Sequence, residues 1–279
     1  MGLGKKIWVG ALGAGLGAWA HAGIAQDAKQ IVQQAVNAEL AAARDDQSHW
    51  RYLESEMDHS QYVVVETEHG ALKRHIEEYG RPASAAAIAA DNENIQKFIH
   101  DPGMQQKQRQ NGAHDDKSAT ELTNLLAQAF VWKVESETAE TVTLSYRPDG
   151  NFHPPDMEAR VMGDMAGTLI VDRTQHRIRT FKGTLQTDVT IGFGFLARLK
   201  QGGTFDIERR QLAPGVWQIT ESHVHIDGRA LFFHSIGEQQ DEVKWDLTPV
   251  PPGTTLEQAA EMSKPGYVSG NVPANGTAK

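Results

Sequence analysis

The chain contains no cysteine among its 279 residues. Disulfide bonds, thiol nucleophiles and zinc-thiolate sites are therefore excluded. A bacterial lipid anchor needs a cysteine directly after the signal, so we expect a protein that is not lipid-anchored. Catalytic signatures are missing as well, because the sequence has no GxSxG elbow, SxxK pair, HExxH helix or EF-hand loop. The sequence names no reaction and predicts no cofactor.

Basic residues are few, and long apolar runs are missing. The chain has 27 Lys and Arg against 36 Asp and Glu, a net charge of −9, and no long run of one sign. That balance argues against a broad nucleic-acid surface. The apolar run at 7–20 has about 14 residues, short of the roughly 20 that a membrane-spanning helix needs. We expect no nucleic-acid partner and at most transient membrane contact.

Residues 1–25 have the order of parts found in a secretory signal peptide. Lys5 and Lys6 precede the apolar run, and small residues follow at cleavage spacing. This pattern predicts cleavage after Ala22 or Ala25 and a periplasmic or secreted protein. An uncleaved membrane anchor is the alternative.

The rest of the chain is expected to form one α+β domain over residues 26–253. Apolar residues at helical spacing predict three helices, and from about Val131 onward short strands alternate with turns. Such a series indicates an antiparallel sheet. The expected helices cover residues 26–44, 84–100 and 118–130, of which the last two form a helical insertion at about 84–130.

Two further segments complete this outline. The polar stretch 101–117 is expected to be exposed, and Ser118 and Glu121 match a capping box that would start the third helix. Residues 254–279 are expected to form a short helix and then a disordered tail rich in Gly, Pro and Asn.

The stretch VTIGFGFLARLKQGG (189–203) is rich in glycine but alternates like a strand. Apolar residues occupy odd positions up to Phe195, and polar residues or glycines occupy even ones, so one face is apolar. A phosphate loop would instead place its glycines before a helix. Gly192 and Gly194 would let the strand bend sharply. We therefore expect a strongly curved antiparallel sheet, a half-barrel, covered by helices.

The concave side of such a sheet would offer a dry cleft for an apolar ligand. The expected lining residues are apolar side chains of two strands: Val189, Ile191, Phe193, Phe195, Leu231 and Phe233. In the alternative, the helices fill this space as an ordinary core, which leaves an interaction domain without a ligand.

Two hairpins resemble those of periplasmic lipoprotein-sorting carriers and their secreted relatives. MAGTLIVDRTQHRIRTFKGTL (165–185) has a Gly-x-hydrophobic-x-hydrophobic-Asp strand, a turn and a strand that ends in Gly-x-Leu. VVVETEHGALKRHIEEYGRP (63–82) looks like the hairpin that precedes the helices in that family. The resemblance implies a half-barrel closed by helices and a cavity that accepts acyl chains. We therefore expect a non-catalytic carrier for a lipid, an acylated protein or another apolar molecule.

The segment TESHVHIDG (220–228) is the best polar constellation. His223 and His225 stand at strand spacing with Glu221 and Asp227 on the same face, which could hold zinc or another divalent ion. A metal-dependent hydrolase that uses these histidines is thus the second functional hypothesis. A polar outer face of a sheet explains the same residues without a metal.

The strand that contains these histidines has two pairs of apolar residues, and both pairs can face the core only if the strand's alternation shifts by one residue between them. Trp217 and Ile219 are odd, whereas Val224 and Ile226 are even. A bulge around Thr220–Ser222 would reconcile them and would leave both histidines pointing away from the core.

Overall fold

The computed structural model describes residues 18–191, 197–230 and 238–267. Gly192 and Gly194, at which we expect the sheet to bend, lie outside these ranges. The predicted cleavage positions fall within the first helix, which begins at Ala18. Cleavage there remains a prediction.

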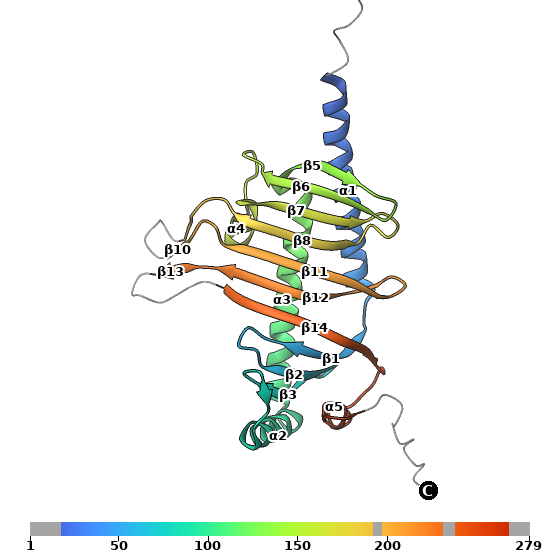
Figure 1. The fold of residues 1–279 in the computed structure, drawn as a ribbon, viewed down its shortest axis with the longest axis vertical. Helices are drawn as coiled ribbons and strands as arrows, with labels where there is room; N and C mark the ends of the chain where they lie inside the picture. The colour runs from blue at the N-terminus through green and yellow to red at the C-terminus, as the bar shows by residue number, and fades with distance from the viewer. Residues whose placement is uncertain (1–17, 192–196, 231–237, 268–279) are drawn as a thin grey trace, which may run out of the picture.

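The described chain is an α+β structure built on an open sheet of 11 strands (Figure 1). All strand pairs are antiparallel, as predicted. The order is β4-β3-β2-β1-β14-β12-β11-β8-β7-β6-β5, so β1 pairs with the last strand, β14. The strands are β1 (His49–Ser55), β2 (Gln61–Thr67), β3 (Gly70–Glu78), β4 (Arg81–Pro82), β5 (Phe130–Glu137), β6 (Thr141–Pro148), β7 (Met165–Asp172), β8 (Ile178–Leu185), β11 (Thr204–Ala213), β12 (Val216–Ile226) and β14 (Glu238–Val250).

A second sheet of three short strands projects from one side of the first (Figure 1). Its order is β13-β10-β9, with β9 (Val189–Ile191), β10 (Ala197–Leu199) and β13 (Gly228–Ala230). The segment at 189–203 therefore forms an antiparallel β9–β10 pair at its described ends.

Five helices are described, and α1 and α3 run behind the large sheet in Figure 1. They are α1 (Ala18–Asp45), α2 (Ala85–His100), α3 (Pro102–Ala129), α4 (Met157–Gly163) and α5 (Leu256–Met262). None of the helices in the described ranges is long and apolar enough to cross a membrane.

The predicted start of the third helix at Ser118 is wrong, because α3 begins 16 residues earlier, at Pro102. The Asp101 side chain accepts hydrogen bonds from the backbone N–H groups of Gly103 and Met104, and Pro102 occupies the first helical position. Both features favour a helix start. The polar stretch is rich in Gln, Lys and Arg, which are good helix formers, so it continues the helix instead of interrupting it. Its predicted exposure is confirmed, because residues 106–117 are exposed at every position.

The two ends of α3 are fastened to opposite ends of the sheet. Near its start, Gln108 exchanges two hydrogen bonds with the backbone of Ala71 on β3, and Arg109 donates to the His69 carbonyl. Near its end, Leu126 is buried and its carbonyl accepts a hydrogen bond from the indole of Trp132 on β5. The helix therefore spans most of the width of the sheet and is held at both sides.

The main core lies between α1, the end of α3 and strands β5–β8. Alternate residues of each strand enter it, as the two-residue period of a strand requires. Its members include Val32 and Val36 of α1 and Leu144 and Leu169 of the sheet, all at most 1% exposed. This core positions α1 and α3 against one end of the sheet.

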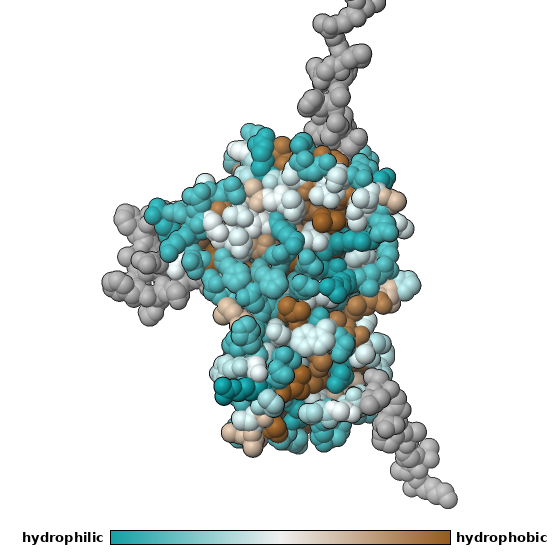
Figure 2. Space-filling view, in the orientation of Figure 1, coloured by the Kyte–Doolittle hydropathy of each residue, from teal (hydrophilic) through white to brown (hydrophobic). Residues whose placement is uncertain are grey.

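The strands β1 and β2 carry buried side chains on both faces, and helices cover one of them. Val63 and Val65 pack with α2 and α5, whereas Val64 packs with Trp50 and Tyr52 on the other face. The face of the molecule in Figure 2 is mainly hydrophilic over β8, β11 and β12, and apolar surface gathers near β1, β2, α2 and α5.

The predicted bulge in β12 is confirmed. In the pairing with β11, Glu221 lies opposite Glu208 but Ile219 lies opposite Arg209, so Thr220 is the extra residue. The insertion brings odd-numbered Ile219 and even-numbered Val224 to the same side of the sheet, where both line one cavity.

Gly183 is a close-packed position of β8. A methyl group there would overlap the Tyr146 hydroxyl oxygen and the ring of Phe205. We expect Gly183→Ala to lower the free energy of unfolding by about 1–3 kcal/mol, because overpacking displaces neighbouring side chains. Urea denaturation at pH 7 measures this change.

Gly112→Ala is the control, because an added methyl at this position in α3 meets no atom within 4 Å. It should raise the free energy of unfolding by about 0.5–1 kcal/mol, the cost of a glycine within a helix. Equal stability of Gly183→Ala and the wild-type protein would contradict the packing described for β8.

Candidate functional site

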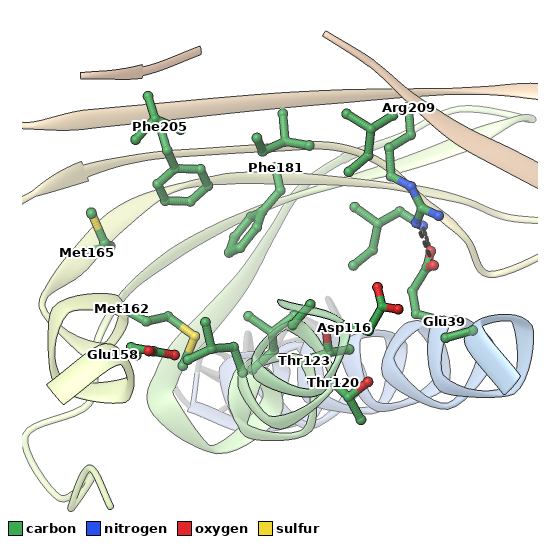
Figure 3. Close-up of a pocket in the computed structure, with 18 of the residues that line it drawn as sticks. Glu39, Asp116, Thr120, Thr123, Glu158, Met162, Met165, Phe181, Phe205 and Arg209 are labelled. Atoms are coloured by element: carbon green, nitrogen blue, oxygen red, sulfur yellow. Dashed lines mark hydrogen bonds and ion pairs between the residues drawn. The ribbon is translucent and has the colours of Figure 1, made fainter. Parts of the chain in front are cut away.

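A cavity of about 1040 Å³ lies between the middle of the large sheet and the helices α1, α3 and α4 (Figure 3). Strands β8, β11 and β12 form one wall, and the three helices form the other. The volume is at the upper end of the range of about 300–1000 Å³ typical of small-molecule sites. The cavity exists where α3 crosses the sheet between its two fastened ends.

Most of the side chains that line the cavity are apolar. Phe181 and Phe205 extend from the sheet toward the helices, and Met162 on α4 lies opposite them (Figure 3). Phe181 and Phe205 pack edge to face, with ring centroids 4.8 Å apart. The apolar lining consists of Leu40, Ala43, Ala119, Leu122, Leu126, Met157, Val161, Met162, Met165, Ile178, Phe181, Leu199, Phe205, Ile207, Ile219, Val224 and Ile226.

One end of the cavity is polar, and a buried ion-pair network forms it. Glu39 on α1 pairs with Arg209 on β11, accepts a hydrogen bond of 3.0 Å from Nη2 of Arg177, and accepts one of 2.7 Å from the Ile178 N–H. The side chains of Glu39 and Arg177 are 11% and 8% exposed. The network therefore ties α1 to strands β8 and β11 beside the cavity.

The network holds Glu39 in its charged form. Burial alone would raise its pKa, but the charge of Arg209 and the hydrogen bonds from Arg177, Arg209 and the Ile178 N–H outweigh burial and lower the pKa below 4.5. Glu39 is thus a fixed negative charge that organises two guanidinium groups.

The expected lining residues are only partly described, and the one with a described side chain lies elsewhere. Val189 is fully buried in the main core and is absent from the described cavity lining. The backbone of Ile191 pairs with Ala197 in the small sheet. Phe193, Phe195, Leu231 and Phe233 lie outside the described residues.

The described lining of the cavity contains none of the six residues expected from the sequence. The alternation Phe205, Ile207, Arg209 on β11 was available as a signal, because an arginine at an inward position of a strand needs a buried partner. The partner, Glu39, is on α1, far away in the sequence. No local pattern connects it to Arg209.

His223 and His225 lie on the face of β12 opposite the cavity, as predicted. They share one acceptor, Oδ1 of Asp241 on β14, at 2.7 Å from Nδ1 of His223 and 3.0 Å from Nε2 of His225. Within the described ranges, no group of three or more His, Asp or Glu side chains is arranged to hold a metal ion. The cluster is a hydrogen-bonded surface network that lowers the pKa of Asp241, mainly through His223.

Glu39→Gln should make the protein less stable at neutral pH and its stability less dependent on pH. The pKa of Glu39 is lower in the folded than in the unfolded chain, so its contribution is full above about pH 4.5 and is lost as the pH falls through the folded value. Removal of one partner from a buried ion pair costs about 3–5 kcal/mol. Urea denaturation of both proteins between pH 7 and pH 3 measures the difference.

Glu93→Gln is the matched control, because the Glu93–Lys97 pair on α2 is exposed. We expect it to leave stability unchanged within error. A gap between wild type and Glu39→Gln that stays constant down to pH 3 would contradict the role given to Glu39.

No family model, curated protein or solved structure matches the chain. The resemblance of residues 63–82 and 165–185 to lipoprotein-sorting carriers therefore has no support from these comparisons. The cavity and its charged end are the features of the described chain that bear on function.

Proposed function

We propose that the protein is a non-catalytic binding or carrier protein for a lipid, an acylated protein or another apolar molecule. The observation that carries the proposal is the cavity of about 1040 Å³ with its mainly apolar lining. Burial of a ligand's apolar surface there would provide roughly 25 cal/mol per Å² before the costs of ordering. The polar groups at one end would orient the ligand.

The proposal includes a curved sheet. Helix α3 contacts β3 near one edge of the large sheet and β5 at the other edge, while a cavity separates it from β8, β11 and β12 between them. A sheet that bows away from a straight helix accounts for both contacts and for the gap. We infer that the sheet is the half-barrel and that α3 crosses its open side.

Export is part of the proposal and rests on residues 1–25 alone. A cavity that shields apolar surface suits a protein that carries lipids or acyl chains across an aqueous compartment such as the periplasm. The resemblance to lipoprotein-sorting carriers agrees with this role but adds no residue to the site.

The two alternatives find less support. A filled core accounts for the packing of α1 and the end of α3 but not for the space between α3 and the middle strands. A hydrolase that uses His223 and His225 would need a third metal ligand, and within the described ranges no group of three His, Asp or Glu side chains is arranged to hold a metal ion. The shallow pocket beside His223, about 390 Å³, is much smaller than the apolar cavity on the other face of the sheet.

Binding of an apolar fluorescent naphthylamine probe tests the proposal. Ala119 is an exposed residue of α3 that lines the cavity. Because an indole at this position would occupy part of the cavity without opening the main core, we expect Ala119→Trp to weaken probe binding about tenfold. Fluorescence titration of the full chain gives the affinity, and native mass spectrometry of gently purified protein shows any co-purified lipid.

Asn124→Trp is the control, because Asn124 is exposed on the same helix outside the cavity lining. It should bind the probe like the wild-type protein. If the wild-type chain fails to bind the probe, or if both variants bind it equally well, the cavity is not a binding site.

A further inference from the structure

The polar end of the cavity carries charges of both signs. Arg209 on β11 and Asp116 on α3 both line it, and Figure 3 shows them on opposite walls beside Glu39. The drawn ion pair joins Arg209 to Glu39 and leaves Asp116 outside it. A ligand group that enters this end therefore meets a guanidinium on one side and a carboxylate on the other.

The positive side is the ion-pair network of Glu39. Arg177 and Arg209 contribute two guanidinium charges to this network and Glu39 one carboxylate, so the network has a net positive charge, and Arg209 is its arginine that lines the cavity. Within the described chain, Arg209 also has N–H groups that are weakly bonded or have no acceptor. Its Nη2 reaches the Trp217 carbonyl only at 3.5 Å, and its Nε has no acceptor among the described residues. The net positive charge of the network therefore favours an anionic group beside the guanidinium of Arg209.

The negative side lies nearer to water. Asp116 is exposed. Asp46, which directly follows α1 and also lines the cavity, already accepts hydrogen bonds from the Ser48 N–H and, at 3.4 Å, from Gln218. In the described chain Asp116 has no ion-pair partner, so it is free to attract a cationic group at the mouth.

The opposite end of the cavity suits a hydrocarbon tail. Met165 is 3% exposed there, and Phe181, Phe205 and Met162 are half-buried around it (Figure 3). Glu158 on α4 is exposed at this end, and the described lining places no cation beside it. An anionic head group would therefore be repelled at the α4 end and attracted to Arg209.

We propose that the ligand is a zwitterionic amphiphile, with its anionic group at Arg209, its cationic group at Asp116 and its tail among Phe181, Phe205 and Met162. This inference rests on the proposed function and names the ligand class of the same cavity. Complementary charges select among amphiphiles more than they add to affinity, so the head group should change specificity while the tail sets most of the binding strength.

The test uses four amphiphiles with the same dodecyl tail, each below its micellar concentration, in displacement of the naphthylamine probe. They carry phosphocholine, carboxylate, trimethylammonium and maltoside head groups. We expect phosphocholine to bind roughly two- to fivefold more tightly than either singly charged compound, the ratio that one exposed ion pair supplies. The advantage should shrink in 1 M salt, where charges are screened beyond about 3 Å.

Asp116→Asn isolates the cationic contact. It should weaken phosphocholine binding roughly two- to fivefold, strengthen dodecanoate binding by a similar factor and leave the maltoside unchanged. Asp115→Asn is the matched control, because Asp115 is the exposed neighbour outside the cavity lining and should leave the ranking as it is.

The outcomes separate this inference from the proposed function. Failure of all four amphiphiles and of the probe to bind would overturn both. Binding with a singly charged head preferred, or an unchanged ranking in Asp116→Asn, would overturn the zwitterionic ligand and leave the apolar cavity in place.

Discussion

The structure depends on one constraint, which is that α3 cannot collapse onto the sheet it crosses. Residues 106–117 are polar or small and exposed, and burial of their charged and amide groups against the sheet would strip most of them of water without providing partners. The helix is instead held at its ends, by Gln108 and Arg109 on one side and by the packing of Leu126 on the other. The cavity is the space that this arrangement leaves.

The fold was largely predictable because its signals are local. Strand alternation and turn residues identified the antiparallel sheet, and the phase change between Ile219 and Val224 identified the bulge at Thr220. The prediction that α3 starts at Ser118 was wrong for a related reason. The capping box at Ser118 is a genuine local pattern, but an equally good cap at Asp101 lies upstream, and the residues between them favour a helix. Where two helix-start patterns occur in succession, as at Asp101 and Ser118, the helix begins at the first.

The type of candidate site, an apolar cleft between the sheet and the helices, was predictable from the sequence, but the residues that line it were not. Alternation shows that Val189 faces inward, but it does not distinguish a position beneath packed helices from one beneath a gap, and Val189 proved to be packed. That distinction depends on where α3 stands away from the sheet, which is a property of long-range contacts. The pairing of Glu39 with Arg209 is equally non-local, since it joins the first helix to a strand 170 residues later.

The pairing of β1 with β14 has a consequence for biosynthesis. Residues 49–55 find their partners at 243–250, so the two parts of the sheet cannot join until the last strand has left the ribosome. Contacts of such high sequence separation slow folding. The chain therefore stays without its complete sheet until its synthesis is nearly finished, and the edges of β1 and β12 lack their partner strand throughout that time.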